Sequence, residues 1–394
     1  MRKWSVFKLV TALLLSGLLM VWGAGAALAD TGTTSASGSA GSSGSDSTTG
    51  AQQQLTLQQA LTMAVASSNG LNSQSASVNQ ASNNVNTTNT ENAGTLTYTP
   101  SSVTSSVPDS VSSGVEAALN SLTSANLNLS YQQRLLQTSQ DSVVYSVYQD
   151  YLAIVQDEAA LDATQQAFNL ADLTQRVTNL EYQVGSDSQN EVSQENESYA
   201  AAQTSLSSTQ DSLDTAYQQF NQLVGLAPDA RPVLTDQPSF TPLVIGSLDA
   251  EVSRVLAGSP AVLSAQDTVV SDKTALTIVS DVPSENMATG DTLNEAENNV
   301  ATVENSTAQS ERTLYQTIIA LESKQNSLQQ ALTTAETNLQ MTQVEYNVGL
   351  DTKVDLETAQ SNLSQAQLAL LENTVSHQMD VMEFGTPWAV SGGQ

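Results

Sequence analysis

The chain carries one short sequence twice, as Leu-Glu-Tyr-Gln-Val-Gly at residues 180–185 and as Glu-Tyr-Asn-Val-Gly at residues 345–349. Each copy lies between two long helical patterns. A single offset of 164 residues relates Tyr182 to Tyr346 and Gly185 to Gly349. A repeat of this size between matching helices marks a duplicated architecture. The sequence therefore predicts two copies of one helical hairpin.

The match extends beyond these short sequences. The offset holds over most of both hairpins and slips by four residues at the far end, where Gly385 falls on Gly225. Four residues are about one helical turn, so the slip keeps the buried face of the last helix. Each copy also opens with a short amphipathic helix, at residues 57–66 and 248–257.

The N-terminus predicts export. Arg2, Lys3 and Lys8 precede an apolar run at residues 9–22, and Ala27-Leu28-Ala29 offers a cleavage site, so residues 1–29 are typical of a signal peptide. A retained membrane anchor is the alternative. The chain has no cysteine, which excludes disulfides, thiol chemistry and a lipoprotein anchor.

Composition divides the rest of the chain. Residues 30–54 are rich in Ser, Thr and Gly and are predicted to be a disordered linker, and residues 226–246 form a Pro-rich linker. The two helical repeats are therefore predicted at residues 55–225 and 247–385, with a tail at residues 386–394.

The surface is acidic and sparsely charged. The formal net charge is −29, and only 13% of residues are charged. This charge repels nucleic acid, so no nucleic-acid partner is expected. An exterior of uncharged polar residues also suits an acidic medium, although secreted proteins of this kind are often acidic without any such adaptation.

The helical patterns predict an all-α fold. Apolar and small residues follow heptad spacing along residues 199–223, 314–346 and 356–370. No proline occurs from about residue 113 to residue 184, so one helix of roughly 100 Å could run there. We expect long coiled-coil helical hairpins in two tandem repeats. Gly185 and Gly349 are predicted to end their helices in the left-handed conformation, and the next helices to begin near Ser188 and Thr352.

The pattern resembles the TolC family of outer-membrane efflux proteins over nearly all of residues 55–385. The matching landmarks are the Tyr-x-x-Gly turns at residues 182–185 and 346–349 and the sequence Ser-Pro-Ala-Val at residues 259–262. The resemblance implies a passive duct, a homotrimer, and a transporter or adaptor protein of the cell envelope as partner.

One departure concerns the barrel strands of that family. Each spanning strand needs about 9–11 residues. The first copy offers only the alternating run at residues 95–99 before Pro100, and the second offers residues 278–290, which contain Pro283. We therefore predict a divergent member with little or no β-barrel, associated with a membrane without a spanning barrel, and located in an outer membrane only if the host has one.

The resemblance also implies a candidate aperture ring. Glu191 and Asp355 follow the two turns, and in a trimer they would give six carboxylates around one opening, able to bind or select cations. The alternative is that both are ordinary residues of a first helical turn. Two departures concern neighbouring positions, where Asp351 replaces a basic residue and Thr358 an acidic one.

A candidate turn latch comprises Tyr182, Gly185, Tyr346 and Gly349, with plain helix packing of the tyrosines as the alternative. His377 is the only histidine, so no metal site is predicted. No cleft for paired carboxylates is indicated either, so no catalytic residue, no cofactor and no enzymatic activity are expected.

The sequence thus predicts a TolC-like efflux or export duct component of the cell envelope. The alternative is a secreted, non-conducting coiled-coil protein with a structural or adhesive role at the cell surface. An efflux adaptor would need a strand-rich domain that the sequence does not indicate.

Overall fold

A computed structural model describes residues 54–96, 109–278 and 283–391 of the 394-residue chain. These residues belong to one compact unit, Gln52–Gln394, and the other unit, Met1–Ala51, lies outside them. The predicted signal peptide and nearly all of the predicted linker at residues 30–54 therefore fall outside the described residues.

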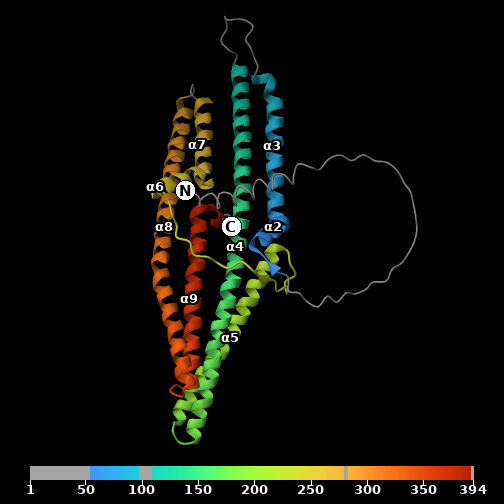
Figure 1. The fold of residues 1–394 in the computed structure, drawn as a ribbon. Coiled ribbons are helices and arrows are strands. Elements are labelled where there is room, and N and C mark those ends of the chain that lie inside the picture. Colours follow the sequence, from blue (N-terminus) through green and yellow to red (C-terminus); the bar gives the residue numbers. More distant parts are fainter. Residues whose placement is uncertain (1–53, 97–108, 279–282, 392–394) are drawn as a thin grey trace, which may run out of the picture. The chain divides into compact units, whose positions relative to one another are not determined.

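Two long helical hairpins dominate the described chain (Figure 1). The first consists of α4 (Asp109–Gln183) and α5 (Gln189–Val224), and the second of α8 (Pro283–Asn347) and α9 (Lys353–Gly385). With 75 residues at about 1.5 Å each, α4 alone is about 110 Å long. The predicted all-α class, built from tandem helical hairpins, is confirmed.

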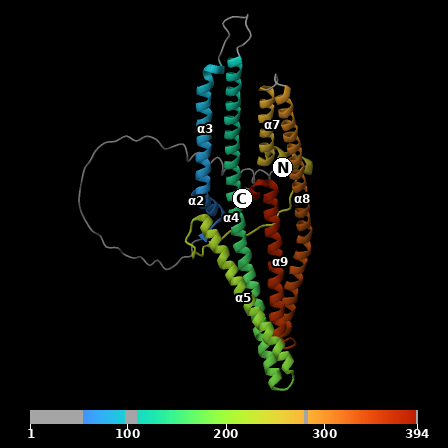
Figure 2. The same cartoon turned by 180° about the vertical axis from the view of Figure 1, so that it is seen from behind.

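Each repeat opens with two further helices. These are α2 (Leu57–Ser67) and α3 (Asn69–Leu96) in the first repeat, and α6 (Leu248–Gly258) and α7 (Pro260–Ile278) in the second. Helix α3 lies along α4, and α7 lies along α8, as Figures 1 and 2 both show. The two repeats therefore share one order of elements: a short helix, a medium helix, a long helix and a returning helix.

Helices also border residues 95–99 and 278–290, the two segments of the sequence with some room for strands. Helix α3 continues to Leu96, and α8 begins at Pro283, where a missing N–H is tolerated because the first turn has no intrahelical acceptor for it. Most of the alternating run at residues 95–99 lies outside the described residues.

A two-stranded parallel sheet joins the start of the first repeat to the linker. Strand β1 (Gln54–Leu55) pairs with β2 (Val233–Leu234) in the register Gln54 to Val233. Gln54, the last residue of the predicted linker, belongs to this sheet. Leu55 of this sheet is only 1% exposed.

An aromatic pair marks the same level in each hairpin. The rings of Tyr151 and Phe220 lie 6.1 Å apart, and those of Tyr315 and Phe384 lie 6.0 Å apart. Both pairs keep the 164-residue offset. The extra length of α5, which has 36 residues against 33 in α9, therefore follows Phe220 and leaves the packed face in register.

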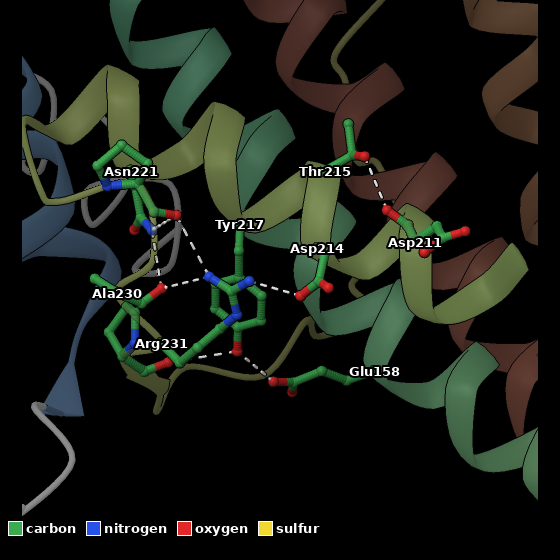
Figure 3. Close-up of polar contacts among 10 residues, drawn as sticks. Glu158, Asp211, Asp214, Thr215, Tyr217, Asn221, Ala230 and Arg231 are labelled. Atoms are coloured by element: carbon green, nitrogen blue, oxygen red, sulfur yellow. Dashed lines mark hydrogen bonds and ion pairs between the residues drawn. The ribbon is translucent and has the colours of Figure 1, made fainter. Parts of the chain in front are cut away.

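The linker between the repeats is anchored to α5 at its start (Figure 3). Arg231 donates to Asp214 Oδ1 at 2.6 Å, and its guanidinium lies 4.9 Å from the centre of the Tyr217 ring. The Tyr217 hydroxyl donates to Glu158 Oε1 of α4 at 2.7 Å. Asn221, which is fully buried, donates its amide to the linker carbonyl of Ala230 at 2.9 Å.

The far end of the linker is anchored to the second hairpin. Leu243 N donates to Glu322 Oε1 at 2.5 Å, and the ring of Phe240 lies 4.5 Å from that of His377. His377 is 2% exposed, and its Nε2 lies 3.3 Å from Glu322 Oε1. The single histidine therefore packs the linker against α8 and α9.

Candidate functional site at the two hairpin turns

The turn between α4 and α5 is closed by backbone hydrogen bonds. Gly185 has φ 81°, and its N–H donates to Tyr182 O at 3.0 Å. Ser186 N donates to Glu181 O at 2.8 Å. An added Cβ on Gly185 would meet no atom within 4 Å, so only the backbone conformation requires glycine.

The turn between α8 and α9 repeats this geometry. Gly349 has φ 79°, and its N–H donates to Tyr346 O at 3.0 Å. Leu350 N donates to Glu345 O at 2.8 Å. The predicted left-handed conformation is confirmed at both glycines, and the two turns lie at the same end of the hairpins (Figures 1 and 2).

Glu191 and Asp355 cap the returning helices. Ser188 N donates to Glu191 Oε2 at 2.7 Å, while Glu191 N donates to Ser188 Oγ at 3.3 Å. Thr352 N donates to Asp355 Oδ2 at 2.9 Å, and Asp355 N donates to Thr352 Oγ1 at 3.2 Å. These are reciprocal capping boxes, so each carboxylate is held at a fixed place beside its turn.

The caps favour the charged form of both carboxyl groups. The hydrogen bond from the Ser188 backbone lowers the pKa of Glu191, and the hydrogen bonds from Thr352, first from its side chain and then from its backbone, lower the pKa of Asp355. Since the folded pKa lies below the unfolded one, the stabilisation is present at neutral pH and is lost as the pH falls through the folded pKa.

A second pair of carboxyl groups lies in each turn. The pKa of Glu181 is raised by its hydrogen bond with Asp187, and the pKa of Glu345 is raised in the same way by Asp351. Sequence reasoning missed these pairs as a repeated feature, although the 164-residue offset relates Glu181 to Glu345 and Asp187 to Asp351. Each turn thus combines a charged cap with a carboxyl pair that holds a proton more readily.

The turns also expose apolar side chains. Val184, Val348 and Leu350 are 79%, 66% and 77% exposed. The candidate latch tyrosines, Tyr182 and Tyr346, are 43% and 38% exposed, and their carbonyls close the turns through the two glycines. The structure therefore shows a backbone role for these tyrosines in a single chain.

Within residues 54–96, 109–278 and 283–391, no group of three or more His, Asp or Glu side chains is arranged to hold a metal ion.

No helix in the described part of the chain combines the length and the apolar character needed to cross a membrane.

No protein-family model and no curated protein matches the sequence. Solved structures do match. The outer-membrane channel OprN has a TM-score of 0.62 and 13% identity, covering 86% of this chain and 90% of that chain. The CmeC outer-membrane channel of Campylobacter jejuni has a TM-score of 0.56 and 12% identity, covering 86% of each chain. The outer-membrane protein VceC of Vibrio cholerae has a TM-score of 0.57 and 16% identity, covering 86% of this chain and 96% of that chain.

The chain shares the TolC-like fold of these outer-membrane proteins. The resemblance drawn from the two Tyr-x-x-Gly turns is confirmed by the structure, at identities of 12–16%. The matches cover 86% of this chain and therefore extend over both repeats.

Proposed function

We propose that the protein is a component of an efflux or export duct in the cell envelope, formed by three copies and working as a passive conduit with a transporter or adaptor. The observation that carries this proposal is the TolC-like fold, which extends over both repeats. The conduit needs no catalytic residue and no cofactor.

The two turns of each copy would line one opening of the duct. Three copies place six capping carboxylates there, from Glu191 and Asp355. Their capping hydrogen bonds support this role, because they fix the side chains in place and lower the pKa of both groups. A ring of fixed negative charge would admit or bind cations in preference to anions.

The same end would meet the partner protein. Val184, Val348 and Leu350 expose apolar side chains to water at both turns. Burial against a transporter or adaptor of the envelope would remove them from water. This proposal places the protein outside the cytoplasm, in keeping with the predicted signal peptide.

Cross-linking tests the ring directly, because the chain has no cysteine to give background. Ser186 and Leu350 occupy equivalent positions in the two turns and take no part in the capping boxes. A Ser186→Cys, Leu350→Cys double variant treated with a short bis-maleimide should give covalent trimers. A Val244→Cys, Val270→Cys double variant, with both cysteines at exposed positions away from the turns, is the matched control and should give none.

If the double variant remains monomeric after treatment under the same conditions, the result contradicts the duct. They would favour the non-conducting surface protein, which needs no closed ring.

A further inference from the structure

A junction far from the turns joins α6, α8, α9 and the C-terminal helix α10 (Trp388–Ser391). Arg254 of α6 donates to Phe384 O at 3.2 Å and to Gly385 O at 3.1 Å, and to Glu251 Oε2 at 2.7 Å. Its positive charge thereby faces the C-terminal end of α9, where the helix dipole favours a cation.

Helix α10 closes this junction against α4. Trp388 Nε1 donates to Asp141 Oδ2 at 2.7 Å, and its ring covers Gly258 so closely that an added Cβ there would lie 3.1 Å from the ring. The Trp388 indole therefore adds a hydrogen bond between the segment after α9 and α4 of the first repeat.

Glu311 of α8 lies buried in this junction. It is 2% exposed, and its Oε1 has no hydrogen-bond partner in the described part of the chain. The 164-residue offset places Glu311 on Val147, which is fully buried in the first repeat. The first repeat therefore has an apolar residue at this position, and burial of a carboxyl oxygen without a hydrogen-bond partner disfavours the charged form of Glu311.

The charged groups around Glu311 come from α6 and α9. Burial raises the pKa of Glu311 to about 7; Arg254 acts against this, whereas Glu251 and Glu383 add to it. Burial also raises the pKa of Glu383. The other titratable groups near the end of α9 and on the facing side of α4 are Asp380, Tyr145 and Asp141, whose pKa values are all raised, first by burial.

We propose that this junction is a proton-operated latch, which holds α6 and the end of α9 firmly on α8 when Glu311 is neutral and loosens when Glu311 is charged. The inference is independent of the duct proposal, since it concerns contacts within one chain. The latch is tightest in mildly acidic surroundings. The uncharged polar exterior of the chain suits the same surroundings.

The direction in which the stability of the closed junction changes with pH follows from the difference in proton binding between its closed and open forms. The folded pKa is raised above the ordinary 4.5, so the closed junction binds a proton more tightly than the open one, and its stability falls as the pH rises through about 7. Between pH 6 and pH 8 the equilibrium constant for opening should rise about tenfold.

Hydrogen exchange measured by mass spectrometry on the full chain tests this. After correction for the intrinsic pH dependence of exchange, amides of residues 252–258 and 380–386 should open about ten times more readily at pH 8 than at pH 6. Glu311→Gln mimics the neutral form and should remove this difference while keeping the protection seen at pH 6. Glu336→Gln, at an exposed position on α8, is the matched control and should behave as the unmodified chain.

Two results would overturn the latch: equal protection of these segments at pH 6 and pH 8 in the unmodified chain, or a tenfold difference that persists in Glu311→Gln. Glu311→Val gives a second variant that installs the residue of the first repeat, and it too should lose the pH dependence.

Discussion

The first and second repeats build the same junction from different chemistry. In the first, Val147 lies in an apolar core, and the hydroxyl of Ser67 donates to Leu223 O near the C-terminal end of α5 at 2.9 Å. In the second, Glu311 takes the place of the valine, and Arg254 donates to the last carbonyls of α9. One repeat closes its returning helix with a neutral group, and the other with a charge.

The aromatic pairs show what the two junctions share. Tyr151 with Phe220 and Tyr315 with Phe384 keep nearly equal ring separations, 6.1 Å and 6.0 Å. The helical register is therefore preserved by a few large side chains, while the polarity of the residues around them differs. Because only the surrounding polarity differs, the second junction can respond to pH while keeping the same packing. Exchanging residues between the repeats tests this difference.

The largest effect is expected from Val147→Glu. This substitution places a carboxyl in an apolar core with no Arg254 equivalent, and should lower the free energy of unfolding by about 3–5 kcal/mol at pH 8. The loss should shrink at pH 5, where the new carboxyl is neutral. Urea unfolding followed by circular dichroism measures both values, and equal losses at the two pH values would contradict the comparison.

The reverse exchange, Glu311→Val, should stabilise the protein. A carboxyl with a pKa of about 7 in the folded state and 4.5 when unfolded destabilises by about 3 kcal/mol at pH 8 and by less than about 1 kcal/mol at pH 5, relative to its neutral form. Removing it should therefore raise the free energy of unfolding mainly at pH 8. A loss of stability at pH 8 would mean that the carboxylate has a stabilising partner.

The glycines that end the returning helices should respond in opposite directions. Gly225 has φ 78°, and an added Cβ would lie 3.2 Å from Ser67 Cβ, so Gly225→Ala should destabilise by about 1–2 kcal/mol. Gly385 ends α9 without a positive φ and with open space around it, so Gly385→Ala should stabilise by up to about 1 kcal/mol. Thermal unfolding of both variants tests the difference, and equal shifts would refute it.

The smallest effects are expected where the repeats agree most closely, at the turns. Ser188→Ala and Thr352→Ala each remove one capping hydroxyl and should each destabilise by about 1 kcal/mol. Hydrogen exchange at residues 189–192 and 353–356 measures the loss locally. A clear inequality between the two variants would show that the turns are not equivalent.

The caps also predict a pH dependence opposite to that of the junction. The pKa values of Glu191 and Asp355 are lowered, so protection of the first turns of α5 and α9 should fall as the pH drops below the ordinary carboxyl range. Glu191→Gln should weaken this dependence in α5 and leave α9 unchanged. Protection of α5 that does not vary with pH in the unmodified chain would argue against the charged cap.

Much of the fold could be predicted because its signals are local. Glycine alone adopts φ near +80° without strain, so Gly185 and Gly349 fixed both turns, and Ser188 and Thr352 marked the following helix starts. The hairpins followed from heptad spacing. The candidate carboxylates could be placed beside the turns for the same reason, since a capping box is encoded within four residues.

The remainder depends on contacts between distant residues. Strand β1 pairs with β2 across nearly 180 positions, and two-residue strands carry no readable pattern. Trp388 lies in a tail with no helical periodicity, and its partner Asp141 is 247 residues away. The burial of Glu311 was not predicted either. The 164-residue offset relates Glu311 to Val147 and would have indicated a buried position.

The central claim is that three copies of this TolC-like chain close a ring. Light scattering on residues 30–394, with negative-stain electron microscopy of the same sample, tests it most directly. We expect a single species with three times the mass of one chain and a central opening. A monodisperse monomer could not form a closed ring and would contradict the account.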